Sequence, residues 1–234
     1  ENNRIRKVPL IAPRGKILAR GGEELVGNKE IKKRLVFDPA LGYEKLDDIN
    51  GAQPPEIVSE WVRDYRLGKS FAHVSGYLGQ VSATEVDKVD PQCPEKGPRK
   101  NYQLVGRSGL EEKYNCVLSG IDGEELIEVD TAGRKVRVIG RKEPVAGTDI
   151  ETTIDRSLQE VAFSALKDQK SAVVISDPQG EILALSSSPS FDPTSFLPNS
   201  DSRVITDLLN NPDLPKQHQK EIDSEPPQAL DLSR

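Results

Sequence analysis

The sequence contains a single Ser-x-x-Lys string, Ser164-Ala165-Leu166-Lys167. A serine and a lysine at this spacing can act as nucleophile and activating base in acyl transfer. The helical periodicity of residues 156–168 places this pair inside a helix, whereas acyl transfer needs a serine that faces an oxyanion hole at the start of a buried helix. We therefore assign no catalytic residue, and an acyl transferase that uses Ser164 and Lys167 is the alternative.

Two further patterns resemble binding sites. Gly106-Arg107-Ser108-Gly109 lacks the spacing and the Lys-Ser/Thr pair of a phosphate-binding loop, so we interpret it as a structural turn. His73 and His218 have no cysteine or carboxylate cluster at ligand spacing, and we interpret His73 as a packed strand residue. We expect no metal ion and no cofactor.

The two cysteines, Cys93 and Cys116, leave two interpretations open. They fit a disulfide in an oxidising compartment or two unrelated buried thiols, and their spacing does not decide between these.

Charge and the length of the apolar runs argue against nucleic-acid binding and against a membrane-spanning segment. The 32 Lys and Arg against 38 Asp and Glu give a net charge of -6, and no basic stripe is interleaved with aromatic residues, so nucleic acid is excluded as a partner. The longest apolar runs, residues 8–12 and 172–175, are far shorter than the roughly 20 residues that cross a bilayer. We therefore expect this piece to be soluble. Because the sequence begins with Glu1 and contains no Met, we also expect that its own start has been removed.

The chain before residue 147 has the pattern of a β-rich region. Its apolar runs and turn residues predict strands at 8–12, 16–19, 25–26 and 73–81, and a hairpin of 124–129 with 135–139 around a turn at 130–133. Helical spacing of Ile57, Trp61, Val62 and Tyr65 predicts an amphipathic helix, and further helical segments are expected at 82–86 and 109–118. Residues 90–99 form a loop that carries Cys93.

The composition changes at residues 143–147, where we place a domain boundary. Asp155 is expected to cap a helix over 156–168, with Leu158, Val161, Ala162, Ala165 and Leu166 on its inner face. Strands at 172–176 and 182–186 then form a hairpin.

Four segments of this pattern resemble the class B penicillin-binding proteins. Residues 12–25 are similar to the family's opening motif Arg-Gly-x-Ile-x-Asp-Arg-x-Gly-x-x-Leu, with Ala19 in place of the Asp. Residues 71–79 resemble a strand that leads into the dimerisation domain. Residues 105–123 resemble its Gly-Lys/Arg-Ser/Thr-Gly-Leu-Glu block and the following Leu-x-Gly-x-x-Gly, which few other families carry. Residues 144–159 and 172–193 resemble the first helix and hairpin of the transpeptidase domain. The likeness extends from about Val8 to Pro215.

The resemblance implies an elongated α+β protein. Residues 1–146 would form the dimerisation or pedestal domain, and residues 147–215 an incomplete transpeptidase-type sandwich. The structural motif would include Arg14, Gly15, Gly106, Gly109, Leu110 and Glu111. We expect Arg14 and Glu111 to form an ion pair at a domain junction; solvated surface is the alternative.

In this family, the serine of a Pro-Pro-Gly-Ser-x-Phe-Lys segment attacks a D-Ala-D-Ala stem peptide in peptidoglycan crosslinking. That segment lies beyond the stretch that matches Ser188–Pro193 and is missing from the sequence. The resemblance therefore implies a non-catalytic portion that positions the D,D-transpeptidase domain. Its partners would be a membrane-embedded glycosyltransferase and other wall-synthesis proteins. Its location would be the extracytoplasmic side of the bacterial membrane, reached through a missing N-terminal anchor, and this location favours the disulfide.

The tail, residues 216–234, has no apolar period, and we expect it to be disordered or frameshifted. Read out of frame from the Glu225 codon, codon degeneracy permits Pro-Pro-Gly-Ser-x-Phe-Lys-Pro, so a frameshift is a hypothesis that DNA sequencing tests. Besides the acyl transferase, an unrelated extracytoplasmic binding module is the second alternative function.

Overall fold

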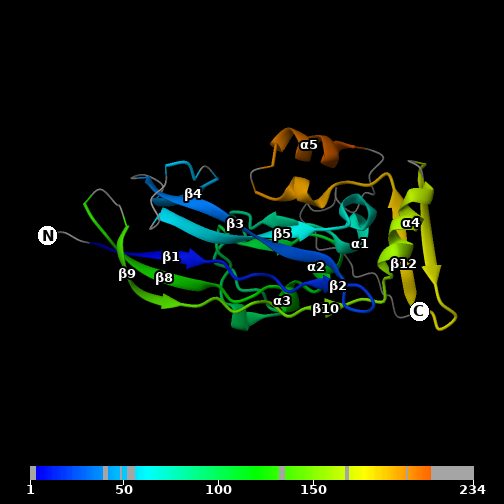
Figure 1. The fold of residues 1–234 in the computed structure, drawn as a ribbon, viewed down its shortest axis with the longest axis horizontal. Helices are drawn as coiled ribbons and strands as arrows, with labels where there is room; N and C mark the ends of the chain where they lie inside the picture. The colour runs from blue at the N-terminus through cyan, green and yellow to red at the C-terminus, as the bar shows by residue number, and fades with distance from the viewer. Residues whose placement is uncertain are drawn as a thin grey trace.

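The structure is a computed structural model of the chain and describes residues 4–38, 42–47, 49–51, 56–131, 135–166, 169–198 and 200–211. The molecule is elongated, with long strands at one end and α4 (Arg156–Leu166) packed on a hairpin at the other (Figure 1). It is an α+β fold dominated by strands, as the sequence predicts.

A three-stranded antiparallel sheet lies at the strand-rich end. Its order is β1-β8-β9, with bounds Arg4–Leu10, Gly123–Val129 and Lys135–Lys142. Alternate residues of β8 are buried, because successive side chains of a strand point to opposite faces. Val8, Ile127 and Val129 pack with Leu35 of the neighbouring sheet in a small core. The predicted hairpin of 124–129 with 135–139 is confirmed, although residues 132–134 of its turn lie outside the described residues.

A second sheet in the strand-rich part contains five strands. Its path is β10-β2-β3-β4, and β5 pairs with the remaining side of β3. The bounds are Ile17–Leu18 for β2, Glu24–Asp38 for β3, Gly42–Leu46 for β4, Ile57–Tyr65 for β5 and Ile150–Glu151 for β10. The β10 strand pairs with β2 in parallel, which brings a late segment of the chain back to an early one.

Short elements follow β5 along the chain. They are a 3-10 turn (Gly68–Ser70), α1 (Ala72–Ser75), the β6-β7 pair (Leu78–Gln80 and Leu104–Gly106), a 3-10 turn (Pro94–Lys96), α2 (Gly109–Lys113) and α3 (Asn115–Leu118). The helical segment predicted over 109–118 is confirmed as α2 and α3.

The last described part contains α4 and the β11-β12 hairpin. The hairpin strands are Ser171–Ser176 and Ile182–Ser188, and a 3-10 turn (Pro193–Phe196) and α5 (Ser202–Asn210) follow them. The Asp155 carboxylate accepts a hydrogen bond from the Leu158 amide at 2.9 Å, as predicted for a helix cap. The tail predicted to be disordered or frameshifted lies outside the described residues.

The main hydrophobic core joins both halves of the sequence. Its buried members are Ile17, Ala19, Leu25, Val26, Tyr65, Phe71, Leu118 and Ile154. They come from β2 and the residue after it, β3, β5, the residue before α1, α3 and the segment before α4. Burial of this apolar surface therefore holds the strand-rich part and the α4 part together.

The predicted helix over Ile57–Tyr65 is wrong, because this segment is strand β5. It pairs antiparallel with β3 from Ile57 opposite Arg34 to Tyr65 opposite Val26. Its β-branched and aromatic residues favour a strand, and pairing along the long β3 strand overrides a spacing that also fits a helix.

Two smaller predictions are also wrong. The strand expected over 73–81 is reduced to β6, because Ala72–Ser75 form α1 and Gly76, with φ of 72°, ends it. The helix expected over 82–86 is a turn. The Ser82 amide donates to the Glu85 carboxylate at 2.8 Å as a helix cap would, but Asp87, with φ of 62°, turns the chain away.

The predicted inner face of α4 is only partly correct. Ala162 and Leu166 are buried, but Val161 is 66% exposed and Ala165 is exposed. Gln159 takes the central buried place instead.

Candidate functional site

A buried ion cluster occupies the point where three segments of the chain meet. Glu111 of α2 is fully buried and accepts hydrogen bonds from Arg63 Nε at 2.6 Å and Arg14 Nε at 3.1 Å. The Arg14 Nη2 atom lies 3.0 Å from the same carboxylate. The expected Arg14–Glu111 pair therefore forms, and the structure adds Arg63 of β5 as a second cation.

Both guanidinium groups also bind neighbouring chain segments. Arg63 Nη1 donates to the carbonyl oxygen of Gly15 at 2.8 Å and lies 3.3 Å from Asn28 Oδ1. Arg14 Nη2 donates to Asn115 Oδ1 at 3.2 Å, and that oxygen also accepts from the Gly106 amide at 3.1 Å. The cluster thus cross-links the segment before β2 with β3, β5, β7 and α3.

The charges of the cluster do not balance. Two buried guanidinium groups share one buried carboxylate, which leaves one net positive charge on these three side chains. Burial lowers the pKa of Arg14; Glu111 opposes this shift and Arg63 reinforces it. The Nη2 atom of Arg63 is buried and has no hydrogen-bond partner among the described residues.

The glycines of the expected motif allow these segments to approach closely. A Cβ atom on Gly106 would lie 2.0 Å from the Glu111 carbonyl oxygen, and one on Gly15 would lie 1.9 Å from the Thr148 carbonyl oxygen. Gly109 has φ of 60°, which a glycine adopts without strain, and begins α2. Leu110 packs on the main core. Residues 106–109 therefore form a structural turn around Glu111.

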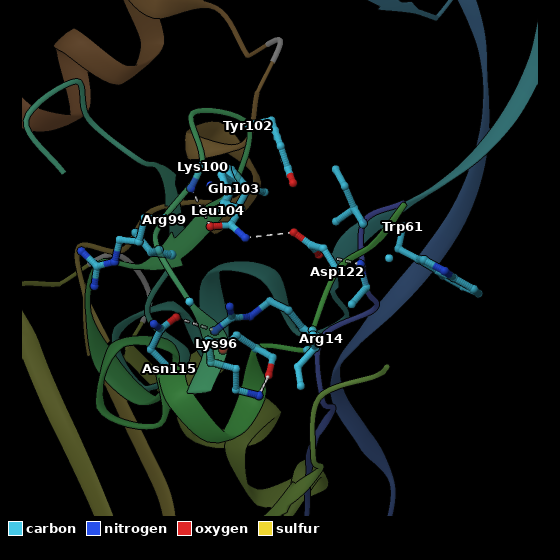
Figure 2. Close-up of a pocket in the computed structure, with 18 of the residues that line it drawn as sticks. Arg14, Trp61, Lys96, Arg99, Lys100, Tyr102, Gln103, Leu104, Asn115 and Asp122 are labelled. Carbon is cyan, nitrogen blue, oxygen red and sulfur yellow. Dashed lines mark hydrogen bonds between the residues drawn. The ribbon is translucent and has the colours of Figure 1, made fainter. Parts of the chain in front are cut away.

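An open pocket of about 500 Å³ lies beside the cluster (Figure 2). Arg14 and Arg63 line it together with residues of the loop before β7. Gln103 Nε2 donates to Asp122 Oδ2 at 2.9 Å, and Lys96 Nζ donates to the Ser119 carbonyl oxygen at 2.8 Å. Burial, with the nearby Asp122 and Glu124, raises the pKa of Tyr102 to about 12. Polar and charged side chains share the pocket wall with apolar ones, among them Trp61, Leu104 and Ile121.

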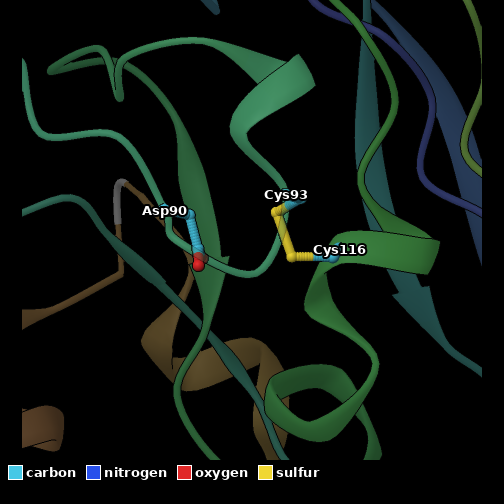
Figure 3. A group of neighbouring side chains, drawn as sticks. All are labelled: Asp90, Cys93 and Cys116. Atoms are coloured by element: carbon cyan, nitrogen blue, oxygen red, sulfur yellow. A yellow bond between two sulfur atoms is a disulfide. The ribbon is translucent and has the colours of Figure 1, made fainter.

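Cys93 and Cys116 are joined by a disulfide that fastens this loop to α3 (Figure 3). Their Cα atoms are 5.6 Å apart. The carboxylate of Asp90 lies close to the two sulfur atoms but accepts a hydrogen bond from Arg99 at 2.8 Å. Bonded sulfur atoms offer no thiolate to a metal ion, so this group is a cross-link.

The remaining candidates lie away from the cluster. His73 is in α1, its Nε2 is 3.1 Å from the Pro189 carbonyl oxygen, and burial lowers its pKa. Ser164 is exposed, and its hydroxyl donates to the Glu160 carbonyl oxygen of its own helix at 2.7 Å. Lys167 and His218 lie outside the described residues.

Two central residues were missed from the sequence. The contact of Arg63 with Glu111 was not predicted, because residues 57–65 were expected to form a helix. Gln159 was not predicted to be buried, because it is a polar residue among apolar ones. A polar side chain on the inner face of a helix nevertheless usually has a buried partner. Its position between Leu158 and Ala162 was the available signal.

Comparison with known proteins places the chain. Residues 40–152 match the Penicillin-binding Protein dimerisation domain. The peptidoglycan D,D-transpeptidase MrdA of Acinetobacter baumannii is 37% identical over 160 residues, which cover 68% of this chain and 23% of that protein. MrdA of Escherichia coli K12 is 36% identical over 157 residues, covering 65% and 24%. The chain spans about a quarter of the length of these relatives.

A solved structure has the same fold over most of the chain. The crystal structure of Pseudomonas aeruginosa PBP2 in complex with WCK 5153 superposes with a TM-score of 0.58 at 26% identity, covering 89% of this chain and 36% of that one. Within the described part of the chain, no helix is long and apolar enough to cross a membrane. On its sequence motifs, its dimerisation-domain match and its fold, the chain belongs to the class B penicillin-binding proteins.

Proposed function

We propose that this chain acts as the positioning part of a class B penicillin-binding protein in peptidoglycan synthesis and does not itself acylate substrate. Residues 1–146 form the pedestal in this proposal, and residues 147–215 form the start of the transpeptidase domain. The protein works on the extracytoplasmic side of the membrane, where the Cys93–Cys116 disulfide is stable.

The observation that carries this proposal is the continuous connection from the ion cluster to α4. Gly15 donates its amide to the Leu118 carbonyl oxygen at 2.8 Å, and the Arg20 amide donates to the Ile154 carbonyl oxygen at 2.9 Å. Gln159 of α4 then donates to the Ser70 carbonyl oxygen at 2.6 Å. These hydrogen bonds and the shared core support the proposal that the strand-rich part holds α4 and its hairpin rigidly in place.

The surroundings of Ser164 support the non-catalytic part of the proposal. Its hydroxyl is exposed and bonded to its own helix, so it faces no oxyanion hole within the described structure. The test is the intact mass of the full chain after incubation with a penicillin, with Ser164→Ala alongside. We expect no adduct on either chain; an adduct that disappears in the variant would make this chain an acyl transferase.

Two solved structures support partners in wall synthesis. One is the complex between Penicillin-Binding Protein (PBP2) and MreC from Helicobacter pylori; its matching chain superposes with a TM-score of 0.63 at 19% identity, covering 91% of this chain and 48% of that one. The other describes a peptidoglycan synthase complex that coordinates polymerisation and crosslinking, with a TM-score of 0.65 at 24% identity, covering 92% and 44%.

By analogy, we propose a membrane-embedded glycosyltransferase as a partner of this chain. The chain should then compete with a full-length class B penicillin-binding protein for that glycosyltransferase in a reconstituted complex. Failure to compete at a large molar excess would contradict the partner assignment.

A further inference from the structure

We propose that His73 is a pH-dependent positioning residue, which holds residues 189–197 against α1 when it is neutral and loosens them when it is protonated. Residues 189–197 follow β12 directly, and β12 packs on both α1 and α4, so this attachment fixes the end of the hairpin. The inference rests on the proposed positioning function and adds a means of controlling how firmly the α4 part is held.

Two hydrogen bonds attach the start of this segment to the region of α1. His73 Nε2 lies 3.1 Å from the Pro189 carbonyl oxygen, and a proton on that nitrogen makes it the donor. The Ser190 hydroxyl donates to the Lys69 carbonyl oxygen at 2.6 Å. Of these two donors, only the imidazole changes its charge between pH 5 and pH 8.

Aromatic packing holds the rest of the segment. Phe191 is 1% exposed and packs on Ala72 and Tyr77. The His73 and Phe191 rings are nearly perpendicular, with centroids 5.2 Å apart. Tyr77 stacks on Phe196 with centroids 3.9 Å apart. The half-buried imidazole is therefore part of an apolar cluster, in which its charged form loses hydration that the packing does not replace.

The charges around α1 do not compensate an imidazolium at His73. Burial lowers the pKa of His73, the Pro189 oxygen opposes part of this shift, and no neighbouring charge contributes to it. Asp192 already accepts hydrogen bonds from the amide and hydroxyl of Thr194, and Glu111 is paired with two arginines. The remaining charged residues on the elements packed around α1 are Lys69, Glu112 and Lys113, with the exposed Asp201, Arg203 and Asp207 of α5; β12 carries none.

The direction of the pH effect follows from the lowered pKa of His73. The folded chain binds this proton less tightly than the unfolded chain, so the contribution of His73 to stability is complete above about pH 6.5. It is lost as the pH falls through the lowered pKa. Because His73 contacts Pro189 and Phe191 directly, opening of residues 189–197 relieves the cost of protonation without unfolding the main core.

The test is an NMR titration of the full 234-residue chain between pH 5 and pH 8. The imidazole resonance of His73 should titrate with a midpoint below 6.5, and the amide resonances of Ser190 and Phe191 should shift with the same midpoint. Hydrogen exchange of the non-proline amides of residues 190–197, corrected for the intrinsic effect of pH, should be about twofold or more faster at pH 5.5 than at pH 7.5.

Three variants separate the charge of His73 from its shape. His73→Gln keeps an N–H donor but does not titrate, so exchange of residues 190–197 should lose its pH dependence and stay close to the neutral rate of the parent. His73→Phe keeps a ring but removes the donor, so exchange should be faster than in the parent at neutral pH and independent of pH. His218→Gln, at the second histidine of the chain, is the matched control and should behave as the parent.

The titration of the parent chain decides the matter even where a variant fails to fold. A His73 midpoint at or above 6.5, as expected if the face of Phe191 stabilised the imidazolium, would overturn the inference. So would amide shifts of Ser190 and Phe191 that do not follow the His73 midpoint, or a folded His73→Gln chain that keeps the pH dependence of the parent.

This experiment fails independently of the proposed function. A chain that competes for the glycosyltransferase at neutral pH but shows no pH-dependent exchange in residues 190–197 would overturn this inference alone. A chain whose segment loosens with the midpoint of His73 but which is acylated at Ser164 would overturn the non-catalytic function and leave the role of His73 standing.

Discussion

Gln159 Nε2 lies 2.6 Å from the carbonyl oxygen of Ser70, which ties the first turns of α4 to the segment that precedes α1. The same nitrogen also contacts the Leu185 carbonyl oxygen at 2.8 Å, and Gln159 Oε1 accepts from the Leu185 amide at 2.9 Å. One fully buried amide thus joins three separate segments.

Replacing Gln159 by Leu should destabilise the chain by about 1–3 kcal/mol, because the backbone groups of Leu185 and Ser70 would lose buried partners. Urea unfolding of the two chains measures the difference. Gln179→Leu, at an exposed turn position, should change the free energy of unfolding by less than about 0.5 kcal/mol. Equal effects of the two substitutions would contradict the role assigned to Gln159.

Glu111→Gln should cost about 3–5 kcal/mol, since it leaves two buried guanidinium groups without a counter-charge. Thermal and urea unfolding both report this loss. The control is Glu112→Gln, one residue along α2 and exposed, where we expect a small change. A Glu111→Gln chain as stable as the parent would show that the cluster does not need its carboxylate.

Gly106→Ala should be destabilising, because its new methyl group would lie 2.0 Å from the Glu111 carbonyl oxygen and displace α2. Gly140→Ala is a matched control in β9, where the nearest atom, Leu126 Cδ1, is 3.7 Å away and makes an ordinary contact. Melting temperatures of the two variants give the comparison, and a tolerated Gly106→Ala would refute the close approach.

Reduction of the Cys93–Cys116 disulfide should lower stability by about 3 kcal/mol, from the entropy of the loop that the bond closes. A reductant should lower the melting temperature of the parent chain and leave a Cys93→Ser, Cys116→Ser chain unchanged. Identical melting with and without reductant in the parent would mean that the bond does not form in solution.

The stability of the loop beside the pocket should depend on pH through Glu85. Hydrogen bonds from Arg107 lower the pKa of Glu85 from 4.5 to about 2, with the Ser82 amide adding to this shift. Because the folded state holds this proton less tightly than the unfolded state, Glu85 stabilises the fold above about pH 4.5, and this contribution is lost as the pH falls toward 2.

Urea unfolding between pH 2 and pH 7 should therefore show a smaller pH dependence for Glu85→Gln than for the parent chain. The difference between the two curves isolates this carboxylate from the others. Parallel curves across the range would contradict the assignment.

Much of the fold follows from local patterns in the sequence. The hairpins, the α4 helix with its Asp155 cap and the glycine turn before Glu111 each depend on neighbouring residues, so propensity and turn chemistry predict them. Strand β5 does not, because its identity depends on pairing with β3, and no local pattern reports that pairing.

The site was predictable only in part for the same reason. Arg14 and Glu111 were recognisable from their glycine motifs. Arg63 was not, because only its strand pairing brings it to Glu111. The net charge of the cluster therefore required the three-dimensional structure.

The parallel pairing of β2 with β10 has a consequence for the order in which the protein folds. Ile17 lies beside Ile150, about 130 residues later in the chain. A chain that emerges from its N-terminus cannot complete this pairing until the late strand has appeared, and contacts so distant in sequence form slowly. The edge of β2 that pairs with β10 must therefore stay open until residues 150–151 have been made, which gives chaperones a defined segment to protect.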